Sequence, residues 1–112
     1  MGGMRETQYV PTLTLDSLLG DLPAPDFVKI DIEGAEIMAL SGATHMIQDV
    51  RPVFYIEVSE AHSAEALRIF HSANYIASSP AGDLLTGECT PNTFFVPKEN
   101  QKALDILSIK AV

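Results

Sequence analysis

Charged residues alternate with apolar ones along the segment Lys29-Ile30-Asp31-Ile32-Glu33. Side chains of a strand alternate between its two faces, so Lys29, Asp31 and Glu33 are predicted to share one face, with successive members about 6.6 Å apart. A carboxylate can accept a proton from a hydroxyl group, and crowded carboxylates raise one another's pKa toward neutral values. This segment therefore predicts a site for acid–base chemistry, with Asp31 and Glu33 as its candidate catalytic residues.

A second acidic group closes the next predicted strand, residues 53–58, where Glu57 is followed by Ser59 and Glu60. In open α/β sheets, ligands bind beyond the carboxyl ends of the strands. We therefore expect Glu57 to converge with the first two carboxylates on one rim of the sheet.

Other interpretations of these residues stay open. Lys29 could pair with Asp31, while Glu33 and Glu36 could favour the positive N-terminal end of the following helix. Asp31 and Glu33 could instead bind Mg²⁺ and support phosphoryl transfer. His62 follows the Glu57 strand and is a second candidate for a general base.

The elements that must position these groups follow the order strand, helix, strand, helix. They are predicted at residues 27–32, 34–49 with a break at Gly42, 53–58 and 63–73. A crossover of helix length implies parallel pairing with a right-handed connection. Two further short strands, at residues 75–77 and 93–96, suit an antiparallel return, and a helix is predicted over residues 98–107. The expected fold class is α/β, with a mostly parallel sheet and an antiparallel final strand.

Composition narrows the class of protein. The 112 residues are 46% hydrophobic and 20% charged, as in ordinary globular domains. A formal net charge of −8 opposes binding to nucleic acid or to anionic membrane surfaces. Cys89 is the single cysteine and has no basic neighbour, so we expect neither a disulfide nor a reactive thiolate. No apolar run reaches the roughly 18 residues of a membrane span, and a cytoplasmic location is expected.

Several blocks of the sequence resemble the FkbM-type methyltransferases in order and spacing. The blocks are Thr14-Leu15-Asp16-Ser17-Leu18-Leu19, Val28-Lys29-Ile30-Asp31-Ile32-Glu33-Gly34-Ala35-Glu36, Leu40-Ser41-Gly42-Ala43, Arg51-Pro52 before the Glu57 strand, and Pro91-Asn92-Thr93-Phe94-Phe95-Val96-Pro97. Together they cover nearly the whole chain.

The resemblance implies a partial Rossmann-like class I methyltransferase fold and O-methyl transfer from S-adenosylmethionine to a hydroxyl group of a sugar or natural product. It places Asp31 and Glu33 at the methionine end of the cofactor or at the acceptor, with Glu57 beside them as a further catalytic residue. It makes Asp16 a supporting residue of the cofactor site and Asn92 a contact to the small-molecule or glycan acceptor. We expect no metal ion in the site.

The glycine-rich turn with which this family holds its cofactor has no counterpart, because none of the seven glycines stands in a Gly-x-Gly pattern that follows a strand and opens a helix. We therefore expect residues 1–112 to be the C-terminal half of a methyltransferase domain, with residues 1–10 as a loose end. Such a half is expected to bind S-adenosylmethionine poorly, to be inactive alone and to self-associate through an exposed sheet edge. The alternative is a non-catalytic binding or assembly half-domain that a partner chain completes.

Overall fold

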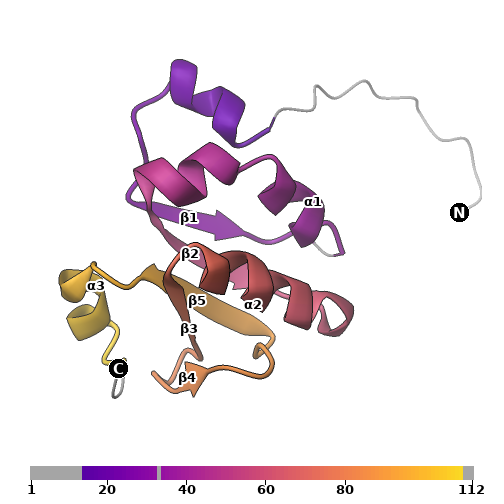
Figure 1. Cartoon of the computed structure of the whole chain (residues 1–112), viewed down its shortest axis with the longest axis vertical. Coiled ribbons are helices and arrows are strands. Elements are labelled where there is room, and N and C mark those ends of the chain that lie inside the picture. Colours follow the sequence, from indigo (N-terminus) through magenta and orange to yellow (C-terminus); the bar gives the residue numbers. More distant parts are fainter. Residues whose placement is uncertain (1–13, 33, 110–112) are drawn as a thin grey trace, which may run out of the picture.

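The computed structural model describes residues 14–32 and 34–109 of the chain, and Figure 1 shows one mixed sheet with helices on it. The strands are β1 (Phe27–Ile30), β2 (Val53–Glu57), β3 (Tyr75–Ser78), β4 (Leu84–Leu85) and β5 (Asn92–Pro97). The α-helices are α1 (Glu36–Ser41), α2 (Ser63–Ser72) and α3 (Gln101–Ile106). Three short helices of other types are η1 (Asp16–Gly20), η2 (Met46–Val50) and η3 (Glu60–His62).

The sheet has the strand order β1-β2-β5-β3-β4. Within the described residues only β1 and β2 pair in parallel, whereas the β2–β5, β5–β3 and β3–β4 pairs are antiparallel. The prediction of a mostly parallel sheet was therefore wrong, although the antiparallel placement of the final strand is confirmed. The reason is that β5 returns between β2 and β3, so β2 and β3, which run in the same direction, never become neighbours.

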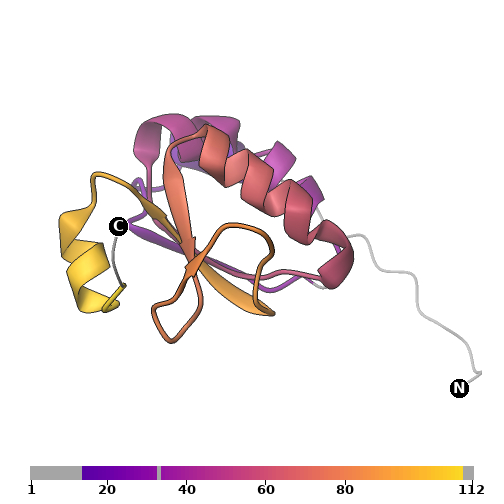
Figure 2. The same cartoon turned by 60° about the horizontal axis from the view of Figure 1, so that its bottom comes forward.

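One face of the sheet is covered by α1, η2 and α2, as Figure 2 shows from the side. The amphipathic period of α2 turns Leu67 and Phe70 inward. The Phe70 ring stacks on Phe95 of β5 with centroids 4.1 Å apart and contacts Tyr75 of β3 at 5.0 Å. These aromatic contacts join α2 to the middle of the sheet.

The opposite face is covered by α3 alone among the described helices. Leu104 of α3 packs with one residue from each of three strands, and these are Val53, Ile76 and Val96. Toward β1 the same face stays open, with Phe27 and Lys29 exposed. Where α3 packs, helices cover both faces of the sheet and the protein has three layers. Toward β1, helices cover one face only and the protein has two layers.

Local features of the helices agree with the sequence in part. The predicted break at Gly42 is confirmed, because α1 ends at Ser41, and a Cβ on Gly42 would lie 2.9 Å from Cβ of Thr14. The strand β1 ends at Ile30, two residues earlier than predicted. The short strand β4 was missed, and the predicted loose end at residues 1–10 lies outside the described residues.

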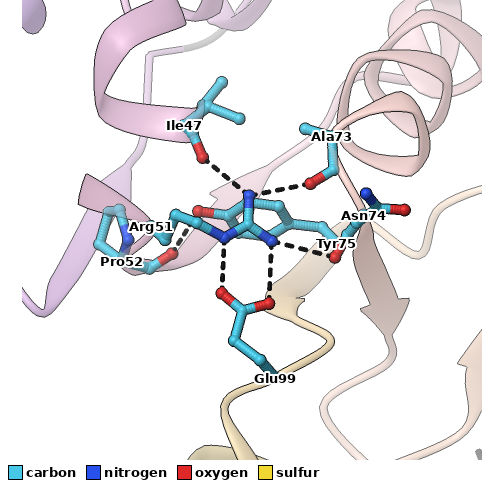
Figure 3. Close-up of polar contacts among 7 residues, drawn as sticks. All are labelled: Ile47, Arg51, Pro52, Ala73, Asn74, Tyr75 and Glu99. Atoms are coloured by element: carbon cyan, nitrogen blue, oxygen red, sulfur yellow. Dashed lines mark hydrogen bonds and ion pairs between the residues drawn. The ribbon is translucent and has the colours of Figure 1, made fainter. Parts of the chain in front are cut away.

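Arg51 joins the ends of two helices to the C-terminal segment (Figure 3). It has a positive φ of 62°, and its guanidinium group donates to the carbonyl oxygens of Ile47 at 3.2 Å, Ala73 at 2.9 Å and Asn74 at 3.2 Å. It also forms two hydrogen bonds to the Glu99 carboxylate, at 2.6 and 3.1 Å. These bonds raise the pKa of Arg51 and lower the pKa of Glu99. Arg51 thereby satisfies carbonyls that helix ends leave without partners.

The Tyr75 ring lies under this guanidinium, with the Arg51 Cζ 4.9 Å from the ring centroid. Its buried hydroxyl donates to the carbonyl oxygen of Pro52 at 2.8 Å. Burial raises the pKa of this phenol above its ordinary value. The aromatic core and the Arg51 cluster are therefore one connected unit at the start of β2 and β3.

Candidate functional site

The carboxyl ends of β1 and β2 form one edge of the sheet, as expected from the parallel pairing. Ile30 and Ile56 are register partners, and the next residues along the two strands are Asp31 and Glu57. Both side chains are exposed. On the other side of β2, Glu57 is the register partner of Asn92 at the start of β5. Strand pairing therefore brings three of the predicted site residues to the same rim.

A surface hollow of about 400 Å³ lies at this rim. It is lined by Gly34, Glu57, Val58, Ser59, Pro91 and Asn92. Glu57 and Asn92 thus share a hollow, and their catalytic and substrate-binding roles stay predictions. Asp31 does not line this hollow, although it stands at the end of the neighbouring strand.

One interpretation of the sequence paired Lys29 with Asp31. Both residues are described and exposed, and they form no ion pair with each other. Glu33 lies outside the described residues, so its predicted catalytic and substrate-binding roles stay predictions. The magnesium interpretation of Asp31 and Glu33 is untested for the same reason.

The carboxylate of Asp16 is bound within the chain, and its predicted place as a supporting residue of the cofactor site stays a prediction. Its two carboxylate oxygens accept hydrogen bonds from the backbone amides of His45 at 2.9 Å and Met46 at 2.8 Å. These amides lie at the start of η2, where backbone donors lack partners within the helix. Asp16 is therefore occupied as a cap that fixes the first described turn of the chain to the helical layer.

Glu36 is a site residue that sequence reasoning missed. It is the first residue of α1, in agreement with the interpretation that placed it at the N-terminal end of a helix. Its side chain, however, is completely buried. Its Oε2 accepts hydrogen bonds from the Ser59 amide at 2.7 Å and from the Ser59 hydroxyl, and it lies 3.2 Å from Nδ1 of His62. Its Oε1 is buried without a hydrogen-bond partner. Glu36 thus ties α1 to the loop that follows Glu57.

The pKa of Glu36 is lowered from its ordinary value of 4.5 to about 2. Burial works in the opposite direction, since it penalises the charged form. The hydrogen bonds from the Ser59 hydroxyl and amide lower the pKa, as do smaller contributions from the Glu36 amide and His62. Together these hydrogen bonds outweigh the effect of burial. Glu36 is therefore an ionised carboxylate at neutral pH.

A family model of the FkbM methyltransferase domain matches residues 3–77, which is well over half of the chain. The chain belongs to the FkbM methyltransferase domain family. No curated protein and no solved structure matches it significantly. The resemblance inferred from the sequence blocks is thus confirmed.

The FkbM match contains Asp16, Asp31, Glu36 and Glu57, whereas Asn92 lies beyond its end. The rim at β1 and β2 therefore falls within the part of the chain that carries the family signal. Asn92 joins it through the β2–β5 register instead.

Other reactive side chains of this FkbM domain have structural surroundings. Burial raises the pKa of the Cys89 thiol, against weaker opposing hydrogen bonds with Ser63 and Thr93, so the thiol stays protonated at neutral pH. His45 pairs with Asp49 on an exposed helical turn, with Nδ1 2.6 Å from Oδ2. In the described part of the chain, no three His, Cys, Asp or Glu residues are grouped as metal ligands. No helix there combines the length and apolarity needed to cross a membrane.

Proposed function

We propose that this chain is the C-terminal, acceptor-side half of an S-adenosylmethionine-dependent O-methyltransferase. Its rim would hold a hydroxyl group of a sugar or natural product next to the cofactor. The single observation that supports this most is the parallel β1–β2 register, which sets Asp31 and Glu57 side by side at the carboxyl edge. That edge is where α/β sheets bind ligands, and the chain belongs to a methyltransferase family.

The described residues fit one end of the proposed cofactor. S-adenosylmethionine carries an ammonium and a sulfonium cation, and the exposed carboxylates of Asp31 and Glu57 have the sign that attracts both. When bound, the cofactor supplies an electrophilic methyl group. The residues of this chain would hold and orient the acceptor, with Asn92 donating or accepting hydrogen bonds at the hollow. Asp16 contributes only indirectly, because both of its carboxylate oxygens are bound to backbone amides.

The remaining contacts to the cofactor would come from a second half that packs against β1. Within the described residues β1 is an edge strand, so one of its sides offers backbone groups without a strand partner. Two apolar hollows flank it and share Leu15, and the exposed apolar side chains near them include Phe27, Ile32 and Met38. Without the second half, this surface would cover itself by self-association. Light scattering should then show oligomers of the isolated chain, and a stable monomer would argue against this part of the proposal.

Calorimetry and methyl-transfer assays test the proposed activity. The isolated chain is expected to bind S-adenosylmethionine only weakly, and tight binding would refute the assignment of a half-site. Mixed with the N-terminal half of a complete family member, it is expected to bind the cofactor and to methylate hydroxyl acceptors.

Matched variants locate the site in that mixture. Asp31→Asn and Glu57→Gln should each lower transfer about 10²-fold, because a misplaced cofactor or acceptor loses rate by this order. Asp21→Asn removes the same charge from an exposed loop and should change nothing. Equal activity of all three variants would remove the rim from the mechanism.

A non-catalytic assembly half-domain is the second candidate, and the apolar surface beside β1 favours it. It predicts that the chain binds a partner stably while the Asp31→Asn and Glu57→Gln variants bind that partner unchanged and no methyl group is transferred. Co-purification followed by the transfer assay separates the two functions.

A further inference from the structure

Glu36, Ser59 and His62 form a polar cluster directly behind the rim. Ser59 belongs both to this cluster and to the lining of the hollow. Its hydroxyl lies 2.8 Å from Nδ1 of His62. The same Nδ1 lies 3.2 Å from Oε2 of the buried Glu36. His62 is therefore linked to the hollow through a single side chain.

The hydrogen-bond pattern of this cluster determines where the protons lie. Glu36 is ionised and can only accept, so the Ser59 hydroxyl must spend its one proton on Oε2. The Ser59 oxygen is then an acceptor toward His62, as is Oε2. Since both neighbours of Nδ1 are acceptors, Nδ1 must carry a proton.

We infer that His62 is the proton acceptor of the site and that Glu36 is its buried positioning residue. In the neutral ring with a proton on Nδ1, the lone pair lies on Nε2. Nε2 has no hydrogen-bond partner among the described residues, and the His62 side chain is 36% exposed. A buried carboxylate that fixes the ring through Nδ1–H is the arrangement that holds catalytic histidines in one tautomer and stabilises the imidazolium.

The proton-transfer step needs no further reactant. The O–H bond of the acceptor hydroxyl breaks, the proton forms a bond to Nε2, and the electron pair stays on the oxygen. The positive charge of the resulting imidazolium is balanced by Glu36 at 3.2 Å from Nδ1. The identity of the acceptor in this step rests on the proposed methyl transfer. The tautomer of His62 is independent of that proposal.

Two comparisons within the chain support the choice of His62. His45 also faces a carboxylate, but that carboxylate, Asp49, is 64% exposed and lies on the same helical turn. His71 is exposed near the end of α2 and has no interaction of its side chain among the described residues. Only His62 combines a buried carboxylate with a contact to a residue that lines the hollow.

Nitrogen NMR on the isolated chain tests the tautomer directly. At about pH 8, where a histidine of ordinary pKa is neutral, long-range ¹H–¹⁵N spectra report which ring nitrogen carries the proton. We expect His62 to carry it on Nδ1 and the unpartnered His71 to serve as the reference for a free ring. A proton on Nε2 of His62 would overturn the inference without affecting the proposed methyl transfer.

Kinetics of the completed domain test the role. His62→Gln should lower kcat about 10²-fold or more with little change in the KM of the acceptor, and His71→Gln should leave both unchanged. Glu36→Gln should shift His62 away from a single tautomer in the spectrum. If Glu36→Gln does not fold, Ser59→Ala is measured in its place: it leaves the direct Glu36–His62 contact, so His62 should keep its proton on Nδ1. A normal kcat in His62→Gln would overturn the inference, while a wild-type domain that transfers nothing refutes the proposed function and leaves the spectrum to decide on His62.

Discussion

Replacing Arg51 by lysine is expected to destabilise the fold strongly, although it keeps the charge. The guanidinium group contacts three backbone carbonyls in two directions and binds Glu99 through two nitrogens. A lysine has one nitrogen and cannot reproduce this fork. Both residues have a Cβ, so the backbone cost at φ 62° is the same in the two proteins.

The expected loss can be worked from these contacts. Two or three carbonyl hydrogen bonds at about 1 kcal/mol each, with part of a cation–π contact to Tyr75 at roughly 0.5 kcal/mol, give a loss of about 3 kcal/mol. The ion pair adds little, because the Glu99 side chain is 59% exposed and such pairs contribute about 0–1 kcal/mol. Glu99→Gln is therefore the matched control, with an expected loss below about 1 kcal/mol.

Urea unfolding followed by circular dichroism, with linear extrapolation, measures both variants. The deficit of Arg51→Lys should persist in 1 M salt, whereas that of Glu99→Gln should vanish because exposed pairs are screened. Equal losses in the two variants, or recovery of Arg51→Lys in salt, would show that the ion pair and not the carbonyl contacts stabilises this region.

Two further changes probe other parts of the fold. The lowered pKa of Glu36 stabilises the folded state above pH 4.5, and this contribution of about 3 kcal/mol should be lost as the pH falls from 4.5 to about 2. The urea midpoint of Glu36→Gln should therefore depend less on pH across that range than the midpoint of the unchanged protein. An equal dependence in the two proteins would contradict the assignment. Gly82→Ala should lower the free energy of unfolding by about 2 kcal/mol or more, because the φ of Gly82 is 92° and a Cβ there would lie 2.4 Å from the Ser108 carbonyl oxygen. Gly87→Ala is the control: a Cβ there would have nothing within 4 Å, so thermal unfolding should show almost no change.

Local periodicity and connection length were enough to predict the β1–β2 pair and α2. The helix-length segment between the two strands requires a crossover, and the crossover requires parallel pairing. The position of β5 between β2 and β3 could not be predicted in this way. Nothing in the spacing of residues 92–97 says which strands will be their neighbours, since these partners are chosen by tertiary packing such as the Phe70–Phe95 stack.

The site was predictable to a similar extent. The meeting of Asp31 and Glu57 follows from parallel pairing alone, and that of Glu57 and Asn92 follows from the β2–β5 register. Glu36 was missed as a buried group because carboxylates are almost never buried without partners. Its partners Ser59 and His62 come from a loop more than twenty residues later in the chain. The capping contacts of Asp16 with the start of η2 could not be predicted either, because their partners lie about thirty residues later in the chain.

The central strand of this sheet is also the last of the described strands to be synthesised. β2 and β3 are complete when residue 78 has been made, but they have no common neighbour until β5 is added at residues 92–97. At roughly 5–20 residues per second on the ribosome, the β1–β2 and β3–β4 pairs lack a shared neighbouring strand for about a second or more. A stop codon shortly before residue 92 would leave the two pairs joined only through contacts such as the Phe54–Tyr75 and Phe70–Tyr75 ring pairs, without the backbone hydrogen bonds of a continuous sheet.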